Sequence, residues 1–136
     1  MTVMEGSDII GALMGEYQPL LDLVPVTQIK AGLLPDDSPL PAIVVSGISV
    51  VDRQPLKRLA LVRRTERVSV TVLARSHVER QAIIAAVRKC CAGRTGNVGD
   101  ALNVAVITAG TGPDVNGPGG RFERAQDFKV SFDAFD

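Results

Sequence analysis

The chain has 136 residues and a mass of 14.4 kDa, a usual size for one domain, so we expect residues 1–136 to form a single domain. Its 46% apolar and 22% charged residues exclude a disordered chain, and its 4% aromatics exclude a row of stacking platforms for single-stranded nucleic acid. Its 15 basic and 15 acidic side chains give a formal net charge of zero, which argues against a generally basic nucleic-acid binder.

The N-terminal segment predicts a helix, a short strand and a loop. Apolar residues recur at helical spacing over about residues 7–18, and Ser7 is placed to cap that helix. Residues 26–31 predict a short strand. Three prolines within 34–41 predict a crossing loop, because proline fixes φ and lacks a backbone donor.

Two longer stretches, 42–51 and 60–75, are rich in β-branched residues and are typical of strands. In the second stretch apolar residues alternate with other side chains, which predicts a sheet with one buried face. The residues expected on that buried face are Val68, Val70, Val72 and Ala74.

The clearest local signal is a second helix over residues 77–92. Ser76 is placed as its N-cap, Glu79 is expected to reach back to Ser76 in a capping box, and Gly93 is a natural C-cap. The expected buried stripe consists of Val78, Ala82, Ile83, Ala86, Val87 and Cys90. Three basic residues are expected to lie off that stripe, namely Arg80, Arg88 and Lys89.

The C-terminal segment predicts two more strands, over 102–108 and 121–132, separated by a mobile glycine-rich loop at about 110–120. The whole pattern predicts an α+β fold. We expect a two-layer sandwich in which two helices pack on one face of a mainly antiparallel sheet of four to five strands.

No constellation of residues predicts catalysis. His77 is the only histidine and is expected to be an exposed residue of the first helical turn, while Cys90 is expected to be a small core residue. The glycine-rich loop lacks the Gly-Lys-Ser/Thr sequence before a helix that a phosphate-binding loop needs. We therefore expect no enzyme, cofactor or metal site, and a small enzyme built around His77 or Cys90 ranks last among the alternatives.

Neither a signal peptide nor a membrane span is expected, because the N-terminus lacks a basic start and no stretch has about 18 consecutive apolar residues. The zero net charge hides a division of the chain into three parts. Residues 1–52 carry one base and seven acids, residues 53–94 carry eleven bases and two acids, and residues 95–136 carry three bases and six acids.

The basic middle third contains the candidate interaction residues, which are Arg53, Lys57, Arg58, Arg63, Arg64 and Arg67. One interpretation is a solvated hairpin flank, and the other is an electrostatic contact with an acidic partner, such as the acidic first third of a neighbouring copy, or with DNA. On the contact interpretation, charge reversal at Arg63 and Arg64 should impair assembly more than folding.

An ordered set of motifs resembles the bacteriophage tail-completion or tail-terminator family, which joins long non-contractile tails to the head. The set begins with the apolar segment Leu20–Pro25 and continues with the proline-bearing entry into a strand at Ser38–Val45. The strand Val68–Ala74 then leads straight into an alanine-rich helix. The chain closes on Arg124–Phe132, which matches the family's pattern of Arg, a small residue, Gln-Asp-Phe, a basic residue and Val. The resemblance covers roughly residues 7–135, although the glycine-rich loop before the last strand is longer here.

The resemblance implies a ring, usually of six copies, at the tail–neck junction of a virion assembled in the host cytoplasm. One face of the ring would end polymerisation of the tail tube protein, and the other would meet the head-completion or neck proteins. DNA would pass through the channel without sequence recognition. The alternatives are another neck or head-completion adaptor, or a DNA-associated module that binds through residues 53–67.

Overall fold

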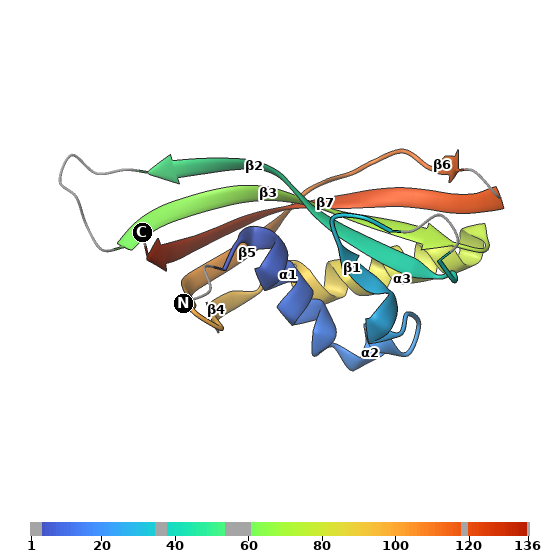
Figure 1. The fold of residues 1–136 in the computed structure, drawn as a ribbon, viewed down its shortest axis with the longest axis horizontal. Coiled ribbons are helices and arrows are strands. Elements are labelled where there is room, and N and C mark those ends of the chain that lie inside the picture. Colours follow the sequence, from blue (N-terminus) through green and yellow to red (C-terminus); the bar gives the residue numbers. More distant parts are fainter. Residues whose placement is uncertain (1–3, 35–37, 54–60, 118–119, 136) are drawn as a thin grey trace.

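The computed structural model describes residues 4–34, 38–53, 61–117 and 120–135. It contains one curled sheet with helices on its inner side (Figure 1). The helical elements are α1 (Gly6–Gly15), α2 (Gln18–Leu21), the 3₁₀ turn η1 (Val26–Gln28) and α3 (His77–Cys91). The strands are β1 (Ile29–Ala31), β2 (Ala42–Arg53), β3 (Leu61–Ala74), β4 (Thr95–Val98), β5 (Ala101–Thr111), β6 (Val115–Gly117) and β7 (Arg121–Phe135).

The sheet is larger than the four to five strands expected. Seven strands pair in the order β1-β2-β3-β7-β5-β4, and β6 pairs with β7. Every pairing is antiparallel except that of β1 with β2, so the mainly antiparallel α+β architecture is confirmed. The sequence did not predict the two short strands β4 and β6, because neither has an alternation of apolar residues. Both form by pairing along a neighbouring long strand, β4 along β5 and β6 along β7.

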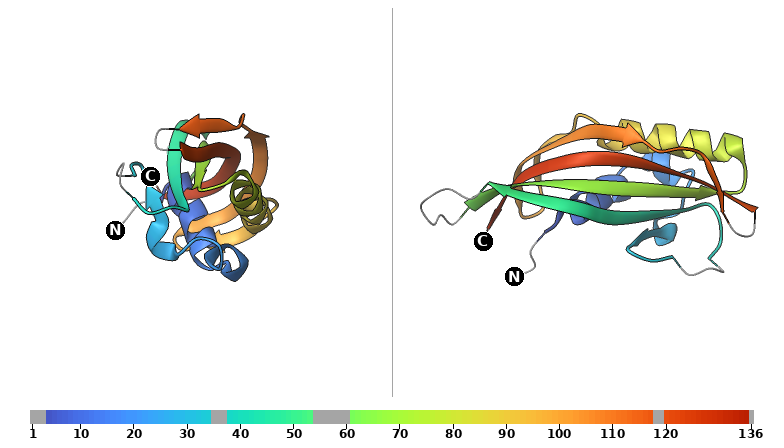
Figure 2. Two further views of the ribbon diagram at one scale, coloured as in Figure 1. Left: turned by 90° about the vertical axis from the view of Figure 1, so that its right-hand side faces the viewer. Right: turned by 90° about the horizontal axis from the view of Figure 1, so that it is seen from above.

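The helices α1 and α3 pack on one face of the sheet and leave the other face open (Figure 2). The predicted buried residues of β3 do face the helices, and all four are buried. They pack with residues of β7 in the antiparallel register that pairs Val68 with Phe128. The largest fully buried side chains include Phe128, Phe132, Ile9, Ile10, Met14 and Leu20.

The first helix begins one residue earlier than expected and has a different cap. Glu5, rather than Ser7, is the N-cap residue, and the Glu5 N–H donates to the Asp8 carboxylate at 2.9 Å. The Gly6 N–H donates to the carboxylate of Glu66 on β3, which ties the start of α1 to the sheet. The helix expected over 7–18 ends earlier, at Gly15, and a separate short helix, α2, begins at Gln18.

For the second helix, α3, the structure confirms the predicted N-cap and differs from the predicted buried stripe. Ser76 accepts a hydrogen bond from the Glu79 N–H at 3.1 Å, but the Glu79 carboxylate reaches Arg75 rather than Ser76. Val78 is 74% exposed, whereas Arg80, which was expected off the stripe, is 3% exposed. The stripe is rotated because the helix also packs under the curled β7, where the Arg80 guanidinium lies 5.4 Å from the Phe122 ring centroid.

The segment expected to be a loop at 110–120 holds regular structure in its described part. β5 extends to Thr111, and Val115–Gly117 forms β6 along the start of β7. Among the described residues, no helix is long and apolar enough to cross a bilayer.

Candidate interaction surface

The candidate basic residues that the structure describes lie on the two long strands β2 and β3, which pair with each other. Arg53 ends β2 directly opposite Arg63 of β3 in the sheet register. Lys57 and Arg58 lie outside the described residues. Because successive residues of a strand point to opposite faces, Arg63 shares the open face of the sheet with Arg67.

Two of these arginines are paired with acids of β7 across the open face. Arg63 Nη1 lies 3.2 Å from an oxygen of Asp133 and donates to the Asn103 carbonyl at 2.7 Å. Hydrogen bonding from Asn103, together with the charge of Arg63, holds the pKa of Asp133 below its ordinary value. These contacts connect β3 to its neighbour β7 and, across β7, to β5, so the charge of Arg63 serves the fold.

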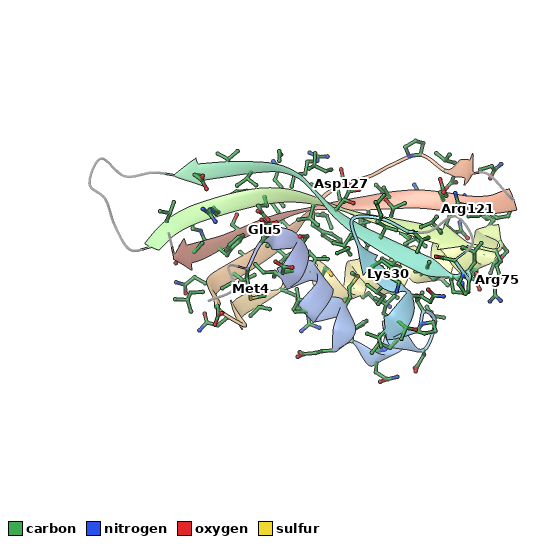
Figure 3. All side chains as sticks on the ribbon, in the orientation of Figure 1. Met4, Glu5, Lys30, Arg75, Arg121 and Asp127 are labelled. Atoms are coloured by element: carbon green, nitrogen blue, oxygen red, sulfur yellow. The ribbon has the colours of Figure 1, made fainter. Side chains whose placement is uncertain are left out.

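The pairing repeats at Arg67, which donates through Nε and Nη2 to one oxygen of Asp127 at 3.1 and 3.0 Å. Arg67 Nη2 also donates to the Ala109 carbonyl of β5 at 2.9 Å. Asp127 lies in the middle of the sheet in Figure 3. Between the two ion pairs, the Thr65 and Ser131 hydroxyls are hydrogen-bonded at 2.9 Å.

Arg64 points to the face opposite Arg63 and pairs with Asp52 of β2 through its Nε at 2.9 Å. The three arginines of β3 therefore lie on two faces, and each has an acidic partner in the same chain. This arrangement does not provide one continuous basic patch within the described parts of β2 and β3. That these residues contact a partner or another subunit stays a prediction.

A second feature of β2 and β3, which the charge pattern of the sequence does not show, is the outer edge of β2. β1 pairs with β2 only at Ile43–Val45, while β2 continues to Arg53. Beyond that pairing, Ile48, Val50 and Val51 are 54%, 54% and 62% exposed. Their β-branched character was noted in the sequence, but exposure at an edge depends on which strand lies beside them.

A cluster of arginines lies at the opposite end of the sheet, where Figure 3 shows Arg75 and Arg121. Arg80 Nη2 lies 2.7 Å from His77 Nδ1 and 3.2 Å from the Asp114 carboxylate. The same Asp114 oxygen lies 3.5 Å from Arg124 Nε. Asp114 therefore anchors the glycine-rich segment to a nearly buried guanidinium, a role that nothing in its sequence position indicated.

The candidates for chemistry are not brought together. His77 is exposed, as expected, while Cys90 and its neighbour Cys91 are free and buried. The hydrogen bond with Cys90 and burial both raise the pKa of the Cys91 thiol, which keeps that thiol protonated. Across the described ranges, no group of three or more His, Cys, Asp or Glu side chains is arranged to hold a metal ion.

The chain matches no family model and, by sequence, no curated protein. Its fold is shared with a chain from a solved structure described as the virion of a native gene transfer agent particle. The two chains superpose with a TM-score of 0.70 at 13% sequence identity, over 96% of this chain and 95% of that chain. The likeness therefore extends over the whole sheet and its helices.

Proposed function

We propose that this protein is a structural subunit of a phage or phage-like virion that caps the head-proximal end of the tail tube. In this role it forms a ring, most simply of six copies, ends polymerisation of the tube and joins the tail to the head. Its partners are other copies of itself, the tail tube protein and a neck or head-completion protein. DNA passes through the channel, and no catalysis or cofactor is part of the role.

The observation that carries the proposal is the structural likeness to a chain of a virion particle over 96% of this chain. A partial likeness would concern one motif, but here the likeness covers the complete architecture. The ordered motifs of the sequence support the same role independently, from Leu20–Pro25 to the closing strand Arg124–Phe132.

The DNA-associated alternative loses support from the ion pairs of β3. Arg63, Arg64 and Arg67 point to two faces and already pair with carboxylates of β2 and β7. A phosphate backbone would have to compete with those carboxylates. The alternative predicts retention on DNA at low salt that weakens steeply as salt is added.

The direct test adds the purified protein to tail tubes growing from the tube protein of the same particle. We expect tube growth to stop and electron microscopy to show a ring at one tube end, while an inert protein of similar mass leaves growth unchanged. A strictly monomeric protein that never binds tubes would overturn the proposal. If that protein also bound DNA with steep salt dependence, the DNA-associated alternative would replace the proposal.

A further inference from the structure

The long edge of β2 is left without a strand partner in the part of the chain that the structure describes. The pairing with β1 ends at Val45, where the Val45 carbonyl accepts from the Gly32 N–H at 3.0 Å. We call Ser46–Arg53 the free edge of β2. Along this edge β3 binds one side of the backbone, and alternate N–H and C=O groups of the other side point outward.

The free edge of β2 has one irregularity that can protect an exposed strand, the break in register between Gly47 and Ser49, and its outer part, from Ser49 onward, is regular. Ile48, Val50 and Val51 present apolar side chains on both faces, and the segment contains no proline or lysine. Its first charge is Asp52, which is already paired with Arg64 at 2.9 Å. An exposed apolar edge of this length favours pairing with another chain, so a partner strand is the occupant that satisfies both its backbone and its side chains.

A matching edge lies on the opposite side of the same sheet. β4 pairs with β5 only as far as Ala105, and Gly93 and Arg94 then bond the backbone of Val106. We call Ile107–Thr111 the free edge of β5, since no other described strand pairs along its outer side. Within it the carbonyls of Ala109 and Gly110 accept from Arg67 and Gln126 of the same chain, and the register with β7 shifts after Thr108, so Ile107 and Thr108 are its regular part. Ile107 is 58% exposed there, so this second edge also has an unprotected β-branched residue.

We propose that the free edge of β2 pairs, antiparallel, with the free edge of β5 from a second copy of this chain. The direction follows from the sheet itself, because three successive antiparallel pairings from β2 through β3 and β7 leave β5 antiparallel to β2. Copies related by rotation about an axis along the strands therefore bring these two edges together in the more stable antiparallel manner.

The contact is head-to-tail, since different surfaces of each copy meet. Such a contact repeats from copy to copy, and it builds a ring when the rotation from each copy to the next closes, which the proposed ring requires. The inference rests on the proposed ring and names the surfaces that build it. Residues 46–53 and 107–111 would then be buried in the assembled particle.

The test uses two lysine variants and their mixture. Val50→Lys blocks the free edge of β2, and Ile107→Lys blocks the free edge of β5. Each should weaken self-association about tenfold or more, because the contact would strip water from an ammonium group. Val26→Lys, on a valine of similar exposure (57%) in η1 outside both edges, is the matched control and should assemble like wild type.

Native mass spectrometry and sedimentation then measure the oligomeric state of each sample, which distinguishes the possible contacts. At a concentration just sufficient for wild type to form closed rings, we expect each edge variant alone to be mainly monomeric. An equimolar mixture should form a heterodimer, because each variant keeps the edge that the other lacks. Circular dichroism checks that the variants stay folded, and Ile48→Lys provides a second block of the β2 edge.

Three results would overturn the inference. The first is wild type that stays monomeric at its highest soluble concentration. The second is either edge variant assembling like wild type, and in particular Ile107→Lys, whose assembly would indicate a symmetric β2–β2 contact. The third is a mixture that stays monomeric. Rings that persist in both variants and still cap tubes would refute the edge contact alone, whereas edge-dependent rings that do not cap tubes would refute the proposed function alone.

Discussion

The close approach of α1 to β3 makes Gly6 a position where a single methyl group should be costly. A Cβ at Gly6 would lie 2.9 Å from Glu66 Cβ and 3.0 Å from Val68 Cγ2, and it would also meet the Glu66 carboxylate. Gly6→Ala must therefore push the helix away from the strand. Overpacking of this kind costs about 1–3 kcal/mol. Weakening the hydrogen bond from the Gly6 N–H to a buried carboxylate costs about 1.5–3 kcal/mol.

Because one helix shift relieves the clash and stretches the hydrogen bond together, we expect a combined loss of about 2–4 kcal/mol in the free energy of unfolding. For a domain of this size, that corresponds to a fall in Tm of roughly 6–16 °C. Gly11→Ala is the matched control in the same helix, since nothing lies within 4 Å of a Cβ at Gly11. It should raise stability by about 0.5–1 kcal/mol through helix propensity.

Urea and thermal unfolding of both variants check this prediction. A Gly6→Ala protein as stable as wild type would show that α1 does not sit against Glu66 and Val68 as described. Equal destabilisation by Gly11→Ala would show that α1 tolerates no alanine, so that the contact with β3 is not the cause.

Three further predictions concern charged residues that connect strands. Burial, reinforced by nearby carboxylates, raises the pKa of Glu66, so its ionisation costs stability as pH rises through the raised value. Glu66→Gln keeps a hydrogen-bond acceptor for the helix but cannot ionise, so it should flatten the fall in stability just above the ordinary glutamate pKa. Urea unfolding at a series of pH values measures this, and an unchanged dependence of stability on pH would contradict it. Asp114→Ala should lower the free energy of unfolding in urea by about 1–2 kcal/mol, because it removes a carboxylate from the Arg80 side chain, which is 4% exposed. The loss is moderate because Asp114 itself is 45% exposed. A double-mutant cycle of Arg67→Ala and Asp127→Ala should give a coupling of about 0.5–1 kcal/mol, and no measurable coupling would mean that water screens the pair completely.

The sequence predicted best those elements whose signal is local. Ser76 before the second helix has a side chain suited to capping, and the structure confirms its hydrogen bond to the Glu79 N–H. The alternation in Val68–Ala74 depends only on the two-residue period of a strand, and those residues are buried as predicted. Both signals are complete within a few residues, so no knowledge of the rest of the chain was needed.

The elements that the sequence did not predict depend on distant partners. The helix stripe was placed on Val78 rather than Arg80, because helical spacing alone does not show that Phe122 and Asp114 lie where a guanidinium can be buried. The cap of α1 was placed at Ser7 because nothing nearby shows that a carboxylate on β3, 60 residues away, binds the helix start at Gly6. The free edge of β2 was missed for the same reason, since its exposure follows from how short β1 is.

The separation of charge along the chain has a different meaning once the strands are paired. The basic middle third contains β3, and the acidic last third contains β7. Their antiparallel pairing places Arg63 directly opposite Asp133, and it lets Arg67, which is opposite Lys129, reach Asp127 diagonally. Those charges select strand neighbours within one copy, and we therefore expect charge reversal at Arg63 to lower stability as well as assembly. In the described parts of β2 and β3, what lacks a partner strand is the apolar outer edge of β2. Association between copies should therefore depend less on salt than the sequence charges suggest, because strand pairing and apolar burial are screened far less than ion pairs at the surface.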